Sequence, residues 1–151
     1  MKITDALLAE HTVFHHIFDH LEAAVPRART LAEVRVLARL LEALLADHSH
    51  TEEDLLMTPL DHCLEQIGQR DLFHEEHEGI ERNLGQALKV RDVRTARRTL
   101  LVAVVASRRH FDKEERVIFP LANRGLKTRT LNELVDTWRS EALTSERQPH
   151  S

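Results

Sequence analysis

Residues 48–59 read HSHTEEDLLMTP, and residues 110–120 read HFDKEERVIFP. Each segment contains a histidine, a pair of glutamates that begins four residues later, an apolar step and a proline. Residues four apart lie on the same face of an α-helix, so each histidine would share that face with the first glutamate of its pair. One such pair is weak evidence of a functional site, whereas two copies in one chain are strong evidence.

The composition is that of an ordinary globular domain with one exception. The 151 residues suit a single domain with a core, and 42% are apolar while 30% are charged. The net charge of −4 favours neither nucleic acid nor an anionic membrane surface as a partner. The exception is the eleven histidines, most of which would be neutral at pH 7 and able to bind metal.

Three observations bear on where the protein works. A single cysteine, Cys63, rules out a disulfide framework or a thiolate metal cluster within one chain. The first residues, MKITDALLAEH, enter helical periodicity without the apolar region of a signal peptide. The longest apolar run, LLVAVVA at 100–106, is too short to span a bilayer. We therefore expect a cytoplasmic protein with no membrane partner.

Residue usage and helix signals predict the architecture. Few glycines and prolines, no tyrosine, and many leucine, alanine, glutamate and arginine residues favour an all-α chain. Four long helices with short connections predict an up-down-up-down four-helix bundle over residues 1–125, followed by a short C-terminal helix and tail over 126–151. The signals place the helices from Thr4 or Asp5 to Ala24, from Thr30 to a kink or end at Pro59, onward from Gly68, from Asp92 to Gly125, and over 130–143, with a frayed tail at 146–151.

The chain also repeats itself loosely. The first half contains AEHTVFHHIFDHLE followed by HSHTEED, and the second half contains EEHEGIERNLGQAL followed by HFDKEE. This pattern predicts two helical hairpins related by an approximate two-fold axis.

Histidines and glutamates fill gaps in the apolar stripes of the expected helices. In the first helix His11 stands between Leu7 and Phe14, at steps of four and three residues. By this spacing six ionisable side chains point inward: His11, His48, Glu52, His77, His110 and Glu114. Burying them without partners would cost several kcal/mol. A lone histidine on an apolar face is usually a hydrogen-bonded core residue, but this repeated set predicts a metal centre.

The same geometry sorts the neighbouring polar residues. Glu53 and Glu115 lie about 140° from their histidines around the helix and are expected to face solvent. Three residues lie one turn from an inward histidine. Each of these is an extra ligand, a group that orients a ligand, or a polar residue at the bundle edge, and they are His15, His74 and Glu81.

The donor set narrows the choice of metal. It exceeds what one tetrahedral zinc ion needs, and its imidazoles argue against an all-oxygen calcium or magnesium site. Two metal ions bridged by Glu52 and Glu114 would use every group. Two Fe²⁺ ions with two carboxylates and a bridging hydroxide leave only a small net positive charge, which suits an interior. Iron or manganese is favoured, and zinc or copper stays open.

These motifs resemble the hemerythrin family, in particular the bacterial hemerythrin-like HHE cation-binding domains. The resemblance runs to about Leu121 and rests on AEH, HSHTEED, EEHEGI and HFDKEERVIFP. It implies a four-helix bundle that holds two iron ions with an oxo or hydroxo bridge. Oxygen-carrying members have two histidines four apart on the third helix and a bridging aspartate. Here His74 and His77 are three apart and Glu114 replaces the aspartate, a pattern closer to the sensor, repair-type and redox members.

The functional expectation is a di-iron protein whose carboxylate-bridged centre binds or reacts with O₂, peroxide or NO, in sensing, storage or redox protection. A peroxide-consuming or iron-delivering enzyme and an iron-responsive regulatory module are the alternatives. Catalysis is undecided, with the balance towards a non-enzyme, because no Ser-His-Asp arrangement or phosphate-binding loop is recognisable. The expected partners are a small diatomic ligand or peroxide and no nucleic acid. The C-terminal helix, with Trp138, would pack on the core, with a homodimer or protein contact as the other reading.

Overall fold

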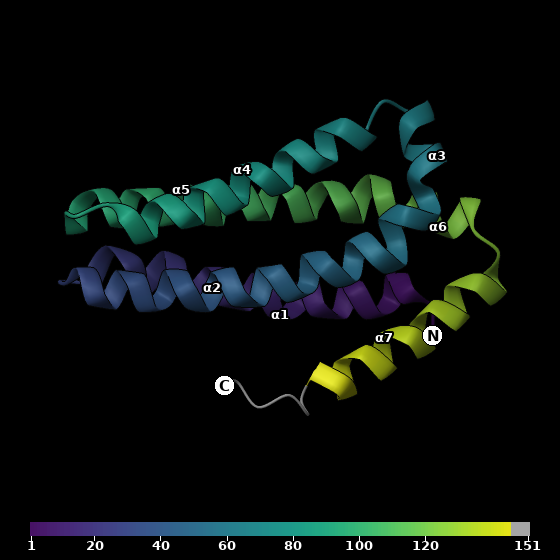
Figure 1. Cartoon of the computed structure of the whole chain (residues 1–151), viewed down its shortest axis with the longest axis horizontal. Helices are drawn as coiled ribbons and strands as arrows, with labels where there is room; N and C mark the ends of the chain where they lie inside the picture. Colours follow the sequence, from purple (N-terminus) through teal and green to yellow (C-terminus); the bar gives the residue numbers. More distant parts are fainter. Residues whose placement is uncertain (146–151) are drawn as a thin grey trace.

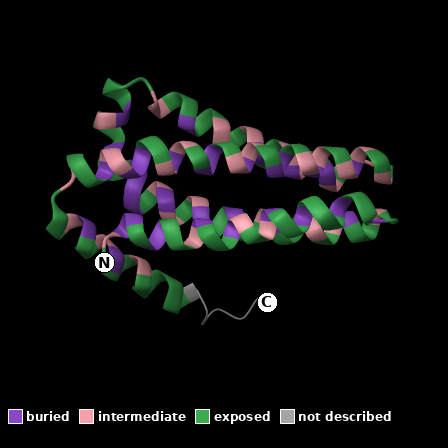
Figure 2. Ribbon diagram, turned by 180° about the vertical axis from the view of Figure 1, so that it is seen from behind, coloured by how far each residue is buried: buried purple, intermediate pink, exposed green. Residues whose placement is uncertain are grey.

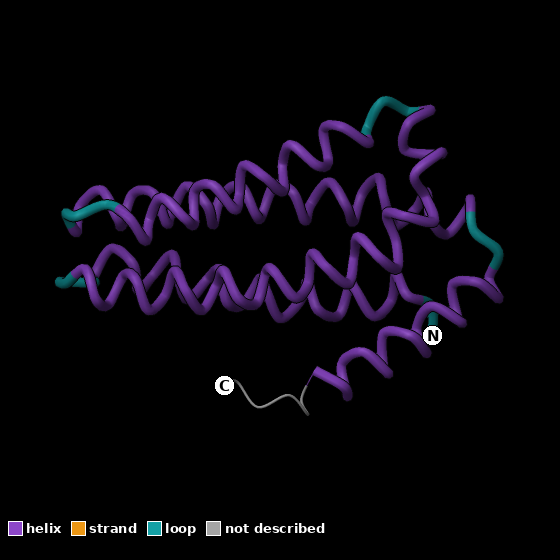
Figure 3. Tube along the Cα trace, in the orientation of Figure 1, coloured by secondary structure: helices purple, strands orange, loops and turns teal. Residues whose placement is uncertain are grey.

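The computed structural model describes residues 1–145, and it is helical apart from short connections (Figure 3). The expected tail at 146–151 lies outside the described residues. The helices are α1 (Ile3–Ala24), α2 (Leu31–Glu52), α3 (Thr58–Gln66), α4 (Arg70–Lys89), α5 (Val93–Lys113), α6 (Phe119–Gly125) and α7 (Thr128–Ser145). A 3₁₀ turn over Val25–Arg27 follows α1, and π-helical turns over Glu53–Met57 and Glu114–Ile118 follow α2 and α5.

The four long helices α1, α2, α4 and α5 run alongside one another as a bundle (Figure 1). The short helices α3 and α6 lie together at the end of the bundle where the chain begins, and α7 runs back from that end along α1. The expectation of an all-α bundle with a C-terminal helix is confirmed. Across the described residues, no helix combines the length and apolar character needed to cross a membrane.

Local sequence signals explain where several helices begin and end. Thr30 accepts a hydrogen bond from the backbone N–H of Glu33 at the start of α2, as an N-cap residue does. Asp92 accepts one from Thr95 at 2.8 Å and begins α5. Gly68 has φ of 69°, a left-handed conformation that favours glycine, and it turns the chain from α3 into α4. The start of α1 corrects a prediction, because Lys2 is the cap, ahead of the expected Thr4 or Asp5.

The two π-helical turns alter the helix phase just beyond the glutamate pairs. A π turn adds one residue to a helical turn and so rotates the residues that follow. Regular α-helical spacing from His110 and Glu114 would point Val117 inward, but it is 38% exposed and Ile118 is buried in its place. The first π turn leads directly into α3, which has Pro59 in its first turn, and the chain bends there. In the straight part of α2, a count of four residues back from His48 would also point Leu44 inward, but Leu45 is buried and Leu44 is 36% exposed.

The buried side chains form two apolar clusters. Figure 2 shows them as stripes on the long helices and on the short helices at the bundle end. The first, here called the distal cluster, is built around Phe18, Leu41, Leu84, Leu100 and Phe111. The second, the proximal cluster, contains residues of α3, α6 and α7 and is built around Leu7, Leu60, Phe73, Ile118 and Leu131. The predicted inward histidines and glutamates lie between these clusters along α1, α2 and α4, and on α5 His110 directly precedes Phe111, a residue of the distal cluster.

Candidate metal centre

The six predicted inward groups converge at one level of the bundle. Five of them are buried and His77 is half-buried. Within the described residues they form two groups, in each of which one ligand atom per residue lies within 4.8 Å of all the others. The two groups are His11, His48, Glu52 and Glu114, and then Glu52, His77, His110 and Glu114. Glu52 and Glu114 therefore belong to both groups.

The imidazoles present their Nε2 atoms to the centre of the cluster. The Nε2 atoms of His11 and His48 are 3.2 Å apart, and those of His77 and His110 are 2.6 Å apart. The Nε2 of His11 is also 3.0 Å from a Glu114 oxygen. The Nε2 of His77 is 3.6 Å from Glu52, and that of His110 contacts Glu114. Two donor nitrogens and two carboxylates on each side are the kind of ligand set that a divalent transition metal uses.

The two carboxylates are buried without hydrogen-bond donors. Both side chains have no exposed surface, and none of their four oxygens makes a hydrogen bond of normal geometry with any described residue. The contacts of Glu114 with histidine nitrogens are short, but their angles are unsuited to hydrogen bonds. A buried carboxylate in this state is costly unless a cation compensates it, so the residues present fit a metal.

The ionisable groups of the cluster differ in how their pKa values are shifted. Burial and the neighbouring Glu114 carboxylate raise the pKa of Glu52 well above its usual range. Burial also acts to raise the pKa of Glu114, but the imidazoles of His11, His110 and His77 outweigh it and hold that pKa well below its usual range. Burial lowers the pKa of His110, yet Glu114 and Glu76 together raise it to about 9. In the absence of a cation, His110 therefore holds a proton at neutral pH.

Three further carboxylates hold the outer nitrogens of the imidazoles. An ionised carboxylate only accepts hydrogen bonds, so each Nδ1–H donates and each Nε2 faces the cluster. The pairs are His11 with Glu115 at 3.0 Å, His48 with Glu10 at 2.6 Å, and His110 with Glu76 at 2.7 Å. This arrangement orients metal-ligating histidines in proteins and is a second indication of a metal site.

These outer carboxylates were not predicted to be hydrogen-bond partners of the histidines. Glu115 was expected to face solvent, but it is only 28% exposed and its Oε1 lies between His11 and His15. Glu10 and Glu76 each stand directly before an inward histidine, in AEH and EEH. That signal was visible, but each glutamate binds the histidine of a different helix, which the sequence of one helix does not indicate.

The three residues of undecided role fall in different places. His15 is half-buried and shares Glu115 with His11, outside both ligand groups. His74 is 46% exposed and lies 3.9 Å from Glu53 at the surface, outside both ligand groups, which favours the alternative of a polar residue at the bundle edge. The neighbouring Phe73 takes the inward position on α4, which turns His74 away. Glu81 is exposed and lines a cavity that reaches His77.

Aromatic rings surround the cluster. The His11 ring stacks on Phe111, with centroids 3.9 Å apart and planes 6° apart. Phe14 and Phe73 contact His48 and His110, with centroids 5.2 Å and 4.5 Å apart.

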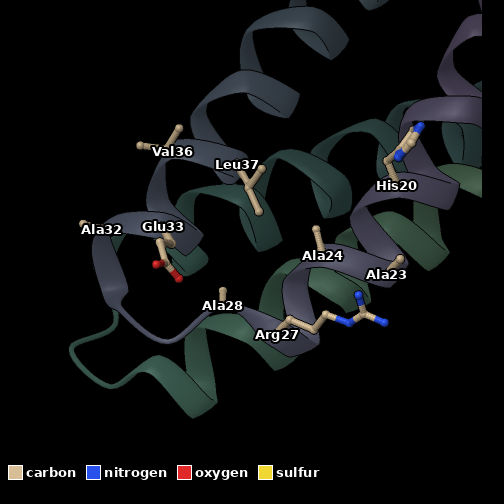
Figure 4. A pocket seen from close by; sticks show the side chains of 9 residues that line it. All are labelled: His20, Ala23, Ala24, Arg27, Ala28, Ala32, Glu33, Val36 and Leu37. Carbon is tan, nitrogen blue, oxygen red and sulfur yellow. The ribbon is translucent and has the colours of Figure 1, made fainter.

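Concave surfaces differ in their relation to the cluster. A cavity of about 220 Å³ between α2 and α4 is lined in part by His77 and His110. A groove of about 640 Å³ between α2 and α7 includes His48 and Trp138. The larger pocket of about 740 Å³ drawn in Figure 4 lies at the other end of α1 and α2, where His20, Arg27 and Glu33 are its polar residues. It contains no residue of either ligand group.

The bundle and its buried donors define a helical cation-binding protein. A family model, the Hemerythrin HHE cation binding domain, matches residues 2–122. The chain therefore belongs to the hemerythrin HHE cation-binding family. The match includes all six donors of the cluster and ends before α7. Comparisons with curated proteins and with solved structures gave no match.

Proposed function

We propose that the chain holds two iron ions bridged by Glu52 and Glu114, and that this centre binds or reacts with O₂, peroxide or NO. The observation that carries the proposal is that both carboxylates belong to both ligand groups. An ion in one group alone would leave the two imidazoles of the other group without a partner. His11 and His48 would hold one ion, and His77 and His110 the other.

Iron suits this donor set better than the common alternatives. Mixed imidazole and carboxylate ligation is typical of non-haem iron, and the family is a cation-binding one. Two adjacent iron ions, when bound, supply electrons to a small oxidant or diatomic ligand. The single half-buried cysteine fits a reducing compartment such as the cytoplasm.

The chain's own residues would orient the donors and limit water. Glu10, Glu76 and Glu115 hold three Nδ1–H groups, which keeps the Nε2 lone pairs on the metal side. The stacked Phe111 covers His11. The adjoining cavity of about 220 Å³ would hold roughly seven waters at ~30 Å³ each, which supports a small ligand over a large substrate.

A regulatory role is the second candidate. Trp138 on α7 donates a hydrogen bond at 2.9 Å to Glu10, whose other oxygen accepts one from His48. Metal at His48 would thus be linked by two hydrogen bonds to a helix beyond the family match. A helix so connected supports sensing of iron or of its ligand.

Metal analysis with spectroscopy tests the main proposal. Protein freed of metal and reloaded anaerobically with Fe²⁺ should contain two iron ions per chain, coupled to each other in Mössbauer and magnetic measurements. Exposure to O₂, hydrogen peroxide or NO should then change the absorbance spectrum. One zinc ion per chain, or no iron after anaerobic loading, would rule out the two-iron centre. Iron that responds to none of the three molecules would leave only the regulatory role.

A further inference from the structure

We propose that Trp138 donates one electron to the metal centre, through Glu10 and His48, when the iron is one electron short of reducing peroxide. Because the electron acceptor is the loaded centre, this role rests on the proposed function. It gives a chemical task to α7, which lies beyond the residues that the family model matches.

Two hydrogen bonds join the indole of Trp138 to the donor cluster. Its Nε1–H donates to Oε1 of Glu10 at 2.9 Å, and the Nδ1–H of His48 donates to Oε2 of the same carboxylate at 2.6 Å. On the far side of the His48 ring, Nε2 faces the other donors and lies 3.2 Å from Nε2 of His11. An ion bound at His48 would therefore be connected to the indole through one imidazole, one carboxylate and two hydrogen bonds.

Each of the three outer carboxylates has a second partner besides the imidazole that it orients. For two of them this partner is another imidazole or an ammonium group, neither of which gives up an electron readily. For the third it is an indole, whose electron-rich fused rings make it the most easily oxidised of the three partners. The pairs are Glu115 with His15, Glu76 with Lys113, and Glu10 with Trp138.

The chain contains few other side chains that could give an electron to the centre. It has no tyrosine, and Trp138 is its only tryptophan. Cys63 and Met57 are oxidisable, but both pack in the proximal cluster. Among the described residues, neither of them hydrogen-bonds to a cluster donor or to an outer carboxylate. Trp138 is therefore the oxidisable side chain that the hydrogen bonds connect to the centre.

Trp138 lies at the boundary between water and the cluster. Its side chain is half-buried and lines the groove of about 640 Å³ between α2 and α7, whereas His48 is only 2% exposed. A small one-electron reductant in the groove would meet the indole without reaching the buried donors. The position suits a side chain that passes electrons inward and is itself reduced again from solvent.

Peroxide reduction fixes the number of electrons that Trp138 must supply. Converting H₂O₂ into two water molecules takes two electrons, together with two protons from solvent. With two Fe²⁺ ions, both electrons come from iron and the indole stays intact. With one Fe²⁺ and one Fe³⁺, the Trp138 ring supplies the second electron and becomes a radical cation. No bond of the indole breaks, and the negative charge of Glu10 stabilises the positive charge of the ring across their hydrogen bond.

Detection of the radical tests the transfer. Iron-loaded protein in the half-oxidised state, mixed with hydrogen peroxide and frozen within milliseconds, should give a tryptophan radical signal in electron paramagnetic resonance. Deuteration of the indole ring should narrow this signal, which assigns it to Trp138. Fully reduced protein given one peroxide per chain is the control and should give no radical. An equal radical yield in the two oxidation states would overturn the proposal.

A relocated indole tests the hydrogen-bonded path. Trp138→Phe should abolish the radical. Adding Ala142→Trp to this variant returns an indole to the groove one helical turn along α7, where it has lost the bond to Glu10. At equal iron content, the double variant should lose most of the radical signal. A wild-type yield in the double variant would show that electron transfer does not depend on the contact with Glu10.

Oxidation of iron-free protein tests the indole and carboxylate without the metal. Because the chain has a single tryptophan, its equilibrium with a reference one-electron oxidant, generated by a laser flash, reports on this ring alone. The charged hydrogen bond should favour the oxidised ring about tenfold in wild type over Glu10→Gln. Glu133→Gln, at an exposed position of α7, is the control of equal charge change. Equal oxidation in wild type and Glu10→Gln would overturn the role assigned to Glu10.

The proposed function and the electron transfer fail in different ways. Protein that takes up no iron would refute the proposed function, and the electron transfer with it, because no acceptor would exist. Half-oxidised iron that consumes peroxide without a radical at Trp138 would refute the electron transfer alone.

Discussion

Trp138 and Glu10 are hydrogen-bonded at 2.9 Å, although 128 positions separate them in the sequence. The indole N–H holds one oxygen of the carboxylate, and the Nδ1–H of His48 holds the other at 2.6 Å. Burial acts to raise the pKa of Glu10, but the bonds from His48 and Trp138 outweigh it and lower that pKa. The C-terminal helix thus helps to keep Glu10 ionised and His48 in the tautomer that ligates through Nε2.

This contact predicts that α7 affects metal affinity. Glu10→Gln should weaken iron binding about 10- to 100-fold, as losses of such orienting carboxylates do. Trp138→Phe keeps the ring but removes the N–H, so its loss should be smaller, in the range of a single hydrogen bond of about 1 kcal/mol. Competition with a chelator of known affinity measures both. Exposed Glu133→Gln on α7 is the control, and wild-type affinity in Glu10→Gln would show that the contact does not matter to the metal.

The glutamate pairs predict a graded response to alanine. Glu52→Ala and Glu114→Ala each remove a carboxylate that belongs to both ligand groups, so each variant should lose most of the bound iron. Glu115→Ala removes the partner of His11 and should keep iron at about 10- to 100-fold lower affinity. Glu53→Ala, at a half-exposed surface position, should match the wild type. Iron content after dialysis provides the ranking, and equal content in all four variants would show that the helix phase assigned to these residues is wrong.

Metal binding should release protons. His110 has a pKa of about 9, so in metal-free protein at pH 7.5 it is largely protonated, and the raised pKa of Glu52 favours a further proton. Because ligands must lose their protons, about one or more should be released per chain that fills with metal. Isothermal titration calorimetry in buffers of different ionisation enthalpy counts them. No dependence of the measured heat on the buffer would contradict the protonated state of the empty cluster.

Stability should depend on pH in opposite directions with and without metal. The folded-state pKa of His110 is raised from 6.5 to about 9, so its contribution is fully present below pH 6.5 and is lost as pH rises through 9. The raised pKa of Glu52 acts in the same direction, while the depressed pKa of Glu114 matters only as pH falls below its usual 4.5. Metal-free protein should therefore lose Tm between pH 6.5 and 9. Loaded protein should lose it towards acid, where protons compete for the imidazoles.

Loading should also raise the melting temperature. Metal that binds only the folded state at a hundred- to thousand-fold excess over Kd stabilises it by roughly 3 to 4 kcal/mol. For a domain of this size that corresponds to a rise in Tm of about 10 °C. Melting curves of loaded and chelated protein at one pH, with the metal content measured in each, test this. Coincident curves would mean that the cluster is equally stable when it holds protons.

The sequence predicted what helical periodicity controls. The steps of three and four residues from Leu7 to His11 to Phe14 place His11 inward, and the same count works on all four long helices because they are straight up to the donors. Glu52 and Glu114, which belong to both ligand groups, were predictable for the same reason. The internal repeat of the two halves independently supported the inward placement of each donor.

What escaped prediction depends on contacts between helices or on departures from α geometry. Val117 was misplaced because a π turn begins at Glu114, and no single residue there signals one. Glu10 and Glu76 orient histidines of other helices, so their partners follow from the packing of the bundle. Leu44 and Leu45 are chemically equivalent neighbours, and only the exact rotation of α2 decides which is buried.

The cluster of donors lies between the distal and proximal apolar clusters, and its imidazoles touch both. The His11 ring contacts Phe111 of the distal cluster and Phe119 of the proximal one. The two apolar clusters can therefore unfold as one unit only if the polar layer between them is stable. The stability of this layer depends on whether metal, protons or water occupy it. With metal bound, the two clusters should melt as one unit, with equal calorimetric and van't Hoff enthalpies. With protons or water there, the α3, α6 and α7 end is free to open by itself, and the chain would behave as two smaller cooperative units.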